Sequence, residues 1–104
     1  MNCLRFRESL LNSNNPKYVD VGDIPAQSSN LNLMMQVFNK LPITTKTVVG
    51  RFTYSGHWMF IGYRYGGSGQ YGMILAMPYY LTPILCLSVN NGTGTCKQVT
   101  LTNA

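Results

Sequence analysis

The spacing of apolar side chains changes at Pro42, and this change separates an expected helix from a series of expected strands. From Thr44 onwards apolar and polar residues alternate with a period of two, which is typical of strands. Clusters of Gly, Asn and Pro interrupt the alternation and mark turns. The expected strands are Lys46–Ser55, His57–Tyr65, Gln70–Met77, Ile84–Val89 and Thr95–Leu101. We therefore expect a mainly β domain of about five antiparallel strands, arranged as a sandwich or as a partly open, barrel-like sheet.

Before Pro42 the apolar residues follow the spacing of a helix. They are Leu31, Leu33, Met34, Val37, Phe38 and Leu41. Ser28, Ser29 and Asn30 offer caps at its start, so we expect one short helix at 30–40 that packs on the sheet. Residues 1–29 are rich in Asn, Ser and Pro and are expected to form an extended arm or linker, which leaves 30–104 as a single domain.

The last expected hairpin contains two of the three cysteines. A buried face that holds Leu85, Leu87, Val99 and Leu101 requires Leu85 opposite Val99 and Cys86 opposite Gln98. Cys86 and Cys96 would then not face each other, so no intrachain disulfide is predicted. The chain also has no Cys-x-x-Cys pair, so we expect no zinc site.

The chain is poor in charge and especially poor in acid. Eight Lys and Arg against three Asp and Glu give a net charge of +5, and only 11% of the residues are charged. All three acids, Glu8, Asp20 and Asp23, precede the expected helix, so most of the chain lacks the carboxylates that general acid–base catalysis and metal sites usually need. His57 is the only histidine and has no carboxylate near it in the sequence. We expect no enzyme activity, no catalytic residue, no metal and no cofactor.

One formal signal has a plain structural interpretation. The glycines of 67–72 match the spacing of a dinucleotide-binding loop, but a strand rather than a helix is expected after them and no acid follows. A hairpin loop is therefore the better interpretation. The first residues lack the apolar run of a secretory signal, and no segment reaches transmembrane length, so we expect synthesis in a cytoplasm without membrane insertion.

Aromatic side chains supply the candidate binding site. Exposed aromatic rings beside polar side chains form platforms on which sugar rings stack. Trp58, Phe52 and Phe60 are expected to be mainly buried. The candidate ligand-binding residues are Trp58, Tyr63, Arg64, Tyr65, Tyr79 and Tyr80. Two other functions stay open: a nucleic-acid-binding face that uses Arg51, Arg64 and the aromatics, and a purely structural assembly domain.

The C-terminal half also resembles a known family. The relevant residues are Gly56-His57-Trp58-Met59-Phe60-Ile61-Gly62-Tyr63-Arg64-Tyr65, then Gln70-Tyr71-Gly72, Ala76, and Asn90-Asn91-Gly92-Thr93 running to Lys97-Gln98-Val99. They resemble the knob-like domains of phage tail fibres and phage-tail-like bacteriocins. The family usually carries tryptophans in and after the last turn, where this chain has Gly94 and Cys96. The resemblance implies a homotrimeric virion protein that attaches to a bacterial surface glycan or protein. Nucleic acid is the less favoured partner because the Lys and Arg residues are spread along the chain and not clustered.

Overall fold

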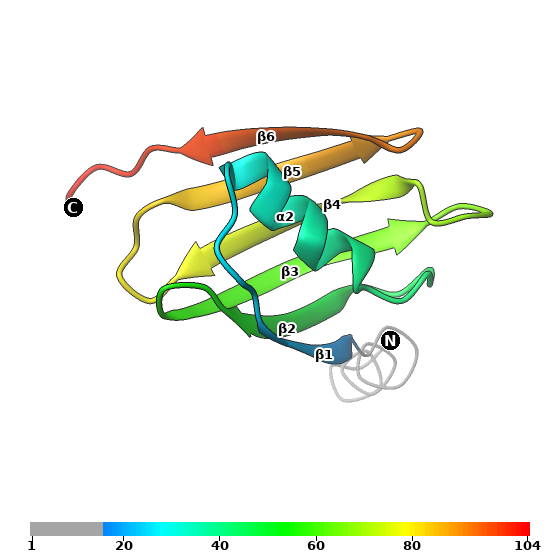
Figure 1. Ribbon diagram of the computed structural model, residues 1–104, viewed down its shortest axis with the longest axis horizontal. Helices are drawn as coiled ribbons and strands as arrows, with labels where there is room; N and C mark the ends of the chain where they lie inside the picture. Colours follow the sequence, from blue (N-terminus) through cyan, green and yellow to red (C-terminus); the bar gives the residue numbers. More distant parts are fainter. Residues whose placement is uncertain (1–15) are drawn as a thin grey trace, which may run out of the picture.

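Residues 16–104 fold into one six-stranded sheet with a helix on one face (Figure 1). The computed structural model describes residues 16–104. The elements are β1 (Lys17–Asp23), α2 (Asn30–Asn39), β2 (Val48–Thr53), β3 (His57–Tyr65), β4 (Tyr71–Pro78), β5 (Ile84–Asn90) and β6 (Thr93–Val99). The strands lie in the sheet in chain order, and every neighbouring pair is antiparallel except β1 and β2. The prediction of a mainly β fold with one packed helix is confirmed.

Strand β1 lies inside the segment that was expected to be an arm. It pairs in parallel with β2, so the sheet is mixed rather than wholly antiparallel. Gly50 on β2 permits this pairing, because a Cβ there would lie 1.9 Å from the carbonyl oxygen of Val19. The part of the expected arm at 1–15 lies outside the described residues, whereas the part from Lys17 to Asp23 belongs to the sheet.

Helix α2 forms where the spacing predicted it. The Oγ of Ser29 accepts a hydrogen bond from the Asn32 amide at 3.1 Å, which caps the first turn. The helix crosses β4, β5 and β6 and buries Leu33, Met34, Val37 and Phe38 against the sheet. Each such side chain contributes about 1.5–3 kcal/mol relative to exposure to water. The part of the chain that the structure describes has no helix that is both long and apolar enough to cross a bilayer.

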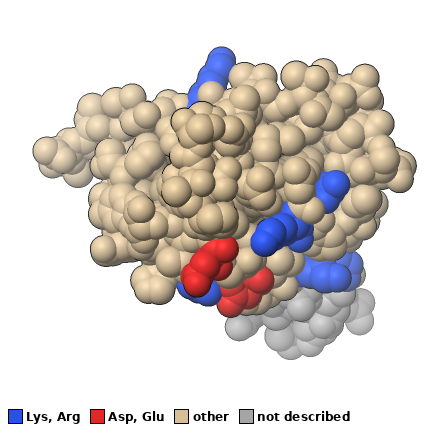
Figure 2. All heavy atoms as spheres, in the orientation of Figure 1, with Lys and Arg blue, Asp and Glu red and all other residues tan. Residues whose placement is uncertain are grey.

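The two faces of the sheet are covered very differently. On β3 and β4 the buried residues alternate with exposed or half-buried ones, and the buried set faces α2. The core on this covered face includes Val48, Phe52, Trp58, Phe60, Ile74, Ala76, Leu85, Leu87 and Val89. Figure 2 looks onto the covered face and shows charged side chains gathered mainly towards the β1 edge. No described segment crosses the opposite face of the sheet, which we call the open face.

The register of the last hairpin differs from the prediction by one residue. Val99 pairs with Ile84 rather than Leu85, and Cys86 pairs with Lys97 rather than Gln98. The cause is the turn: Asn91 and Gly92, with φ of 50° and 81°, form a two-residue loop that makes Asn90 and Thr93 partners. The geometry of the turn, and not the apolar pattern, therefore sets the register of this hairpin.

This register also places the two cysteines of the hairpin. Cys86 lies on the open face, while Cys96 lies opposite Leu87 and packs against the core on the covered face. Both thiols are free. The segment from Val99 to Leu101 does not become a buried strand, and the two side chains remain 40% and 55% exposed.

Candidate ligand-binding face

Strands β3 and β4 place apolar and aromatic side chains on the open face. The rungs that pair them are Met59 with Met77, Ile61 with Leu75, Tyr63 with Met73, and Tyr65 with Tyr71. All of these side chains except Leu75 and Tyr71 are more than a third exposed. An open sheet face normally carries polar residues in alternation with the apolar core positions. This face therefore differs from an ordinary solvated sheet surface.

Three tyrosines form a continuous strip at one end of the open face, and we call them the tyrosine platform: Tyr63, Tyr65 and Tyr71. The ring centroids of Tyr63 and Tyr65 are 5.5 Å apart, and those of Tyr65 and Tyr71 are 5.7 Å apart. The interplanar angles of 38° and 32° leave the rings tilted rather than perpendicular. The hairpin loop at 66–70 produces this strip because it makes Tyr65 and Tyr71 partners across β3 and β4.

Polar side chains lie beside the platform on the same face. Ser88 on β5 pairs with Met73 on one side and with Thr95 on the other. Asn90 and Thr93 form the next rung towards the turn, and all four of these polar residues are exposed. Hydroxyl and amide groups next to aromatic rings have the chemistry that recognises the hydroxyls of a sugar. Tyr71, Ser88, Asn90, Thr93 and Thr95 were not among the predicted site residues.

Tyr79 and Tyr80 are exposed, as predicted, but they lie at the other end of the sheet. They follow Pro78, which pairs with Trp58 near the start of β3, whereas the platform lies at the end of β3. The nine residues of β3 separate the two ends by roughly 25 Å, at about 3.3 Å per residue. The predicted candidates therefore do not form a single site.

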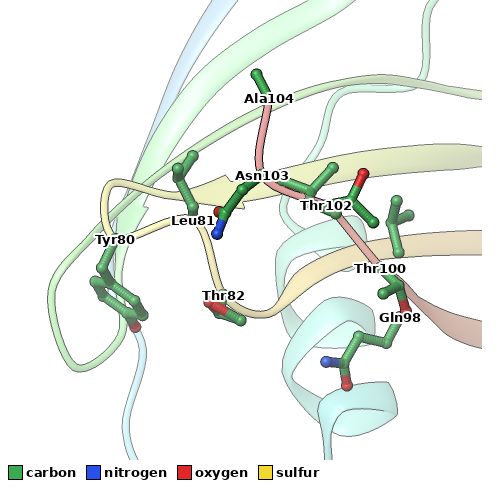
Figure 3. A pocket seen from close by; sticks show the side chains of 10 residues that line it. Tyr80, Leu81, Thr82, Gln98, Thr100, Thr102, Asn103 and Ala104 are labelled. Atoms are coloured by element: carbon green, nitrogen blue, oxygen red, sulfur yellow. The ribbon is translucent and has the colours of Figure 1, made fainter.

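The connector that contains Tyr80 faces the C-terminal residues (Figure 3). Tyr80, Leu81 and Thr82 line one side of a hollow of about 530 Å³, and residues 98–104 line the other. Its walls contain amide, hydroxyl and alkyl groups but no Asp, Glu, Lys, Arg or His side chain. The Tyr80 hydroxyl donates to the Ser55 carbonyl at 3.3 Å, so this ring is held by the β2–β3 turn.

Trp58 does not belong to the candidate site. Its side chain is only 2% exposed, and its ring stacks on Phe52 with centroids 5.3 Å apart. The indole Nε1 donates to the Tyr54 carbonyl at 2.8 Å, so its one polar group is also used inside the fold. The expectation that Trp58 is mainly buried is confirmed, and its proposed contact with a ligand is withdrawn.

Arg64 is likewise a structural residue rather than an open contact. Its Nε donates to the Gly69 carbonyl at 2.8 Å, and its Nη1 donates to the carbonyls of Asn39 and Leu41 at 3.0 and 3.1 Å. The guanidinium also lies 5.2 Å from the centroid of the Phe38 ring. These contacts join the end of α2 to the β3–β4 loop on the covered side. Arg64 was predicted to contact a ligand, and the structure assigns it to the fold instead.

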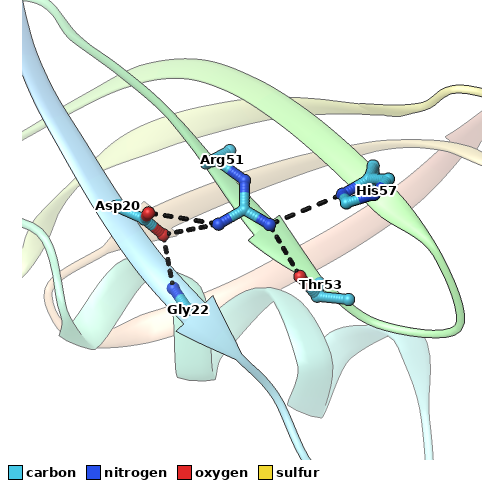
Figure 4. A network of polar contacts seen from close by, with 5 residues as sticks. All are labelled: Asp20, Gly22, Arg51, Thr53 and His57. Atoms are coloured by element: carbon cyan, nitrogen blue, oxygen red, sulfur yellow. Dashed lines mark hydrogen bonds and ion pairs between the residues drawn. The ribbon is translucent and has the colours of Figure 1, made fainter.

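Arg51 lies on the open face and is part of a polar cluster (Figure 4). Its Nη1 donates to both carboxylate oxygens of Asp20 at 2.9 and 3.1 Å, and its Nη2 donates to Thr53 Oγ1 at 2.8 Å. The same Nη2 lies 3.5 Å from His57 Nδ1. Arg51 and Arg64 thus face opposite sides of the sheet, and the predicted basic face that combined them does not form.

This cluster is not arranged as a catalytic or metal site. The carboxylate of Asp20 is neutralised by Arg51 and also accepts from the Gly22 amide at 3.0 Å. A general base needs a proton to remove and an orienting partner, and His57 here meets only a donor. Among the residues that the structure describes, no three His, Cys, Asp or Glu side chains lie close enough to hold a metal ion.

Comparison of the chain with protein-family models, curated proteins and solved structures found no match.

Proposed function

We propose that this chain is a non-enzymatic binding domain that attaches to a saccharide on a bacterial cell surface through the tyrosine platform. The observation that carries the proposal is the alignment of Tyr63, Tyr65 and Tyr71 on an open sheet face. Each ring keeps a face or an edge available to a ligand, because Tyr63 is 38% and Tyr65 47% exposed and Tyr71 is half-buried. A strip of three rings suits an extended chain of sugar units better than a single small molecule.

The surroundings of the platform support the same ligand class. Ser88, Thr93 and Thr95 offer hydroxyls, Asn90 offers an amide, and no described acidic side chain lies on this part of the face. Neutral hydrogen-bonding groups beside aromatic rings favour a hydroxyl-rich ligand. A nucleic-acid ligand would favour clustered Lys and Arg beside the rings, and Arg51 and Arg64 are both engaged elsewhere.

The resemblance to phage tail-fibre knobs points to the same role. The residues that carry it include all of β3, the start of β4 and the β5–β6 hairpin, which are the strands that surround the platform. On this proposal the chain works in a virion as part of a tail fibre, and the saccharide belongs to the host cell.

The test is binding of the purified chain to immobilised lipopolysaccharides and capsular polysaccharides from a panel of bacteria, measured by biolayer interferometry. We expect one or more of them to bind and the Tyr65→Ala variant to lose at least about tenfold in affinity, which corresponds to about 1.4 kcal/mol. Tyr79→Ala is the matched control because Tyr79 is 72% exposed and lies at the far end of the sheet.

Three results would count against the proposal. The first is binding of no polysaccharide in the panel. The second is equal affinity of the Tyr65→Ala variant and the unmodified chain. The third is a loss of binding in Tyr79→Ala but not in Tyr65→Ala, which would move the site to the connector.

A further inference from the structure

Apart from the tyrosine platform, the open face carries an uncharged strip that runs across five strands. One row of paired residues leads from β1 to β5: Tyr18, Val49, Ile61, Leu75 and Cys86. Met59, Met73 and Met77 flank this row on β3 and β4. We call these eight side chains the apolar belt. The tyrosine platform lies beyond it, towards the β3–β4 loop.

The belt is as large as the largest apolar patch that a soluble monomer usually exposes. Tyr18 is 62% exposed, Met59 66%, Ile61 44%, Met73 40% and Met77 38%. These fractions amount to roughly 2.5 fully exposed side chains, or about 500 Å² at about 200 Å² for each large side chain. Contiguous apolar patches of this size on soluble monomers are often functional contact surfaces.

Among residues 16–104, charged side chains of the open face stand only at the two margins of the belt. Arg51 at one margin is already paired with Asp20, and Lys97 at the other lies opposite Cys86 on the last strand. A partner that covers the belt would bury no unpaired charge as long as the exposed Lys97 side chain stays in solvent at the margin, and an unpaired buried charge is the main penalty in an interface. The partner must be apolar itself, since nothing in the belt offers a charge to a charged ligand.

We propose that the belt is covered by the belt of a second copy of this chain, so that two sheets pack face to face with both helices outside. The five exposed side chains of each copy would together bury about 1,000 Å² in the pair. The half-buried belt members and the residues around the belt add to this area, which then reaches the lower limit of about 1,200 Å² for specific interfaces. A copy related by a two-fold axis presents the same uncharged, methionine-rich surface to itself. Methionine adapts to the irregular gaps of such a contact.

The pairing follows the ordinary geometry of β-sandwiches. Stacked sheets lie about 10 Å apart, with strand directions that differ by about 30°. In that arrangement the belts, which run across the strands, lie over each other.

The test is the mass of the full chain by light scattering behind size exclusion, over a range of concentrations. We expect twice the monomer mass of 11.6 kDa. Met59→Lys should give the monomer mass, because Met59 is exposed in the single chain and the substitution places a charge inside the pair. Ile61→Lys is a second variant with the same expected result. Leu101→Lys is the matched control and should stay a dimer, since Leu101 is 55% exposed but lies outside the sheet. Circular dichroism of each variant checks that the fold is retained.

A monomer mass for the unmodified chain at every concentration would overturn the proposal. A threefold mass would also overturn it and would favour the homotrimer that the tail-fibre resemblance implies. A dimer that survives both Met59→Lys and Ile61→Lys with the fold intact would place the contact elsewhere. The mass measurements need no saccharide, so the pairing is tested by a readout that differs from the binding test of the proposed function.

Discussion

The two faces of one sheet use the same strands and consecutive residues, yet they present opposite environments. On β3, Trp58 and Phe60 lie on the covered face and are 2% exposed, while the alternating residues Met59 and Ile61 are 66% and 44% exposed. Both sets are apolar, so hydrophobicity alone does not decide which one becomes the core. The covering segments decide it, because α2 packs its buried stripe on β4, β5 and β6 from one face only, and Ile24 from the segment before the helix joins the same core. The comparison shows that residues 16–104 have enough apolar side chains for two faces and one helix to cover them.

The largest difference between the faces should appear in stability. Phe52→Ala removes a ring that is fully buried and stacked on Trp58, and should lower the free energy of unfolding by about 3–5 kcal/mol. Tyr65→Ala removes a ring of similar size from the open face and should lower it by about 1–3 kcal/mol, since two ring–ring contacts of about 0.5–1.5 kcal/mol each are lost. Urea unfolding followed by tryptophan fluorescence or circular dichroism measures both. Equal losses would mean that the open face is part of the folding core.

The two arginines extend the comparison to charged groups. Arg64→Met on the covered side removes three hydrogen bonds to carbonyls and should lower the free energy of unfolding by about 1.5–3 kcal/mol. Arg51→Met on the open face breaks an exposed ion pair, in which the two side chains are 33% and 51% exposed, and should lower it by at most about 1 kcal/mol. The same urea titrations decide the order. A larger loss for Arg51→Met would contradict the structural role assigned to Arg64.

Much of this fold could be predicted from the sequence because its local signals agree. The helix has a serine cap and a regular apolar stripe, and the β3 bounds match the prediction from His57 to Tyr65. Strand β1 could not be predicted in the same way. It has few apolar residues. Its parallel partner β2 follows it in the chain only after the whole of α2, so no local turn signal links the two strands. The predicted register of the last hairpin was wrong because the apolar pattern was given more weight than the Asn-Gly turn.

The candidate site could be predicted only in part. The exposure of Tyr63 and Tyr65 was expected from the amphipathic character of tyrosine, and the structure confirms it. Tyr71 could have been added from the length of the β3–β4 loop, which makes it the partner of Tyr65. The structural role of Arg64 depends on contacts with Asn39, Leu41 and Gly69, and no local pattern reveals contacts between such distant segments.

The smallest expected effect concerns Cys96, which faces the covered side of the sheet. Burial raises the pKa of this thiol, and the neighbouring Cys86 raises it further. The folded chain therefore holds the thiol proton more tightly than the unfolded chain does. The stabilisation from this difference is complete below the unfolded pKa of about 8.5, and it is lost as the pH rises through the higher folded value.

Alkylation of Cys96 by iodoacetamide measures this difference directly. In a C3S/C86S variant Cys96 is the only thiol, and burial, the larger of the two causes, still acts on it. The reaction rate should rise with pH at a higher midpoint in the folded chain than in the same variant unfolded in concentrated urea, because only the thiolate reacts. Identical midpoints would mean that Cys96 is solvated like a thiol of the open face. In that case the hairpin would not be held against the core at Leu87, and the two faces would differ less at β6 than they do at β3.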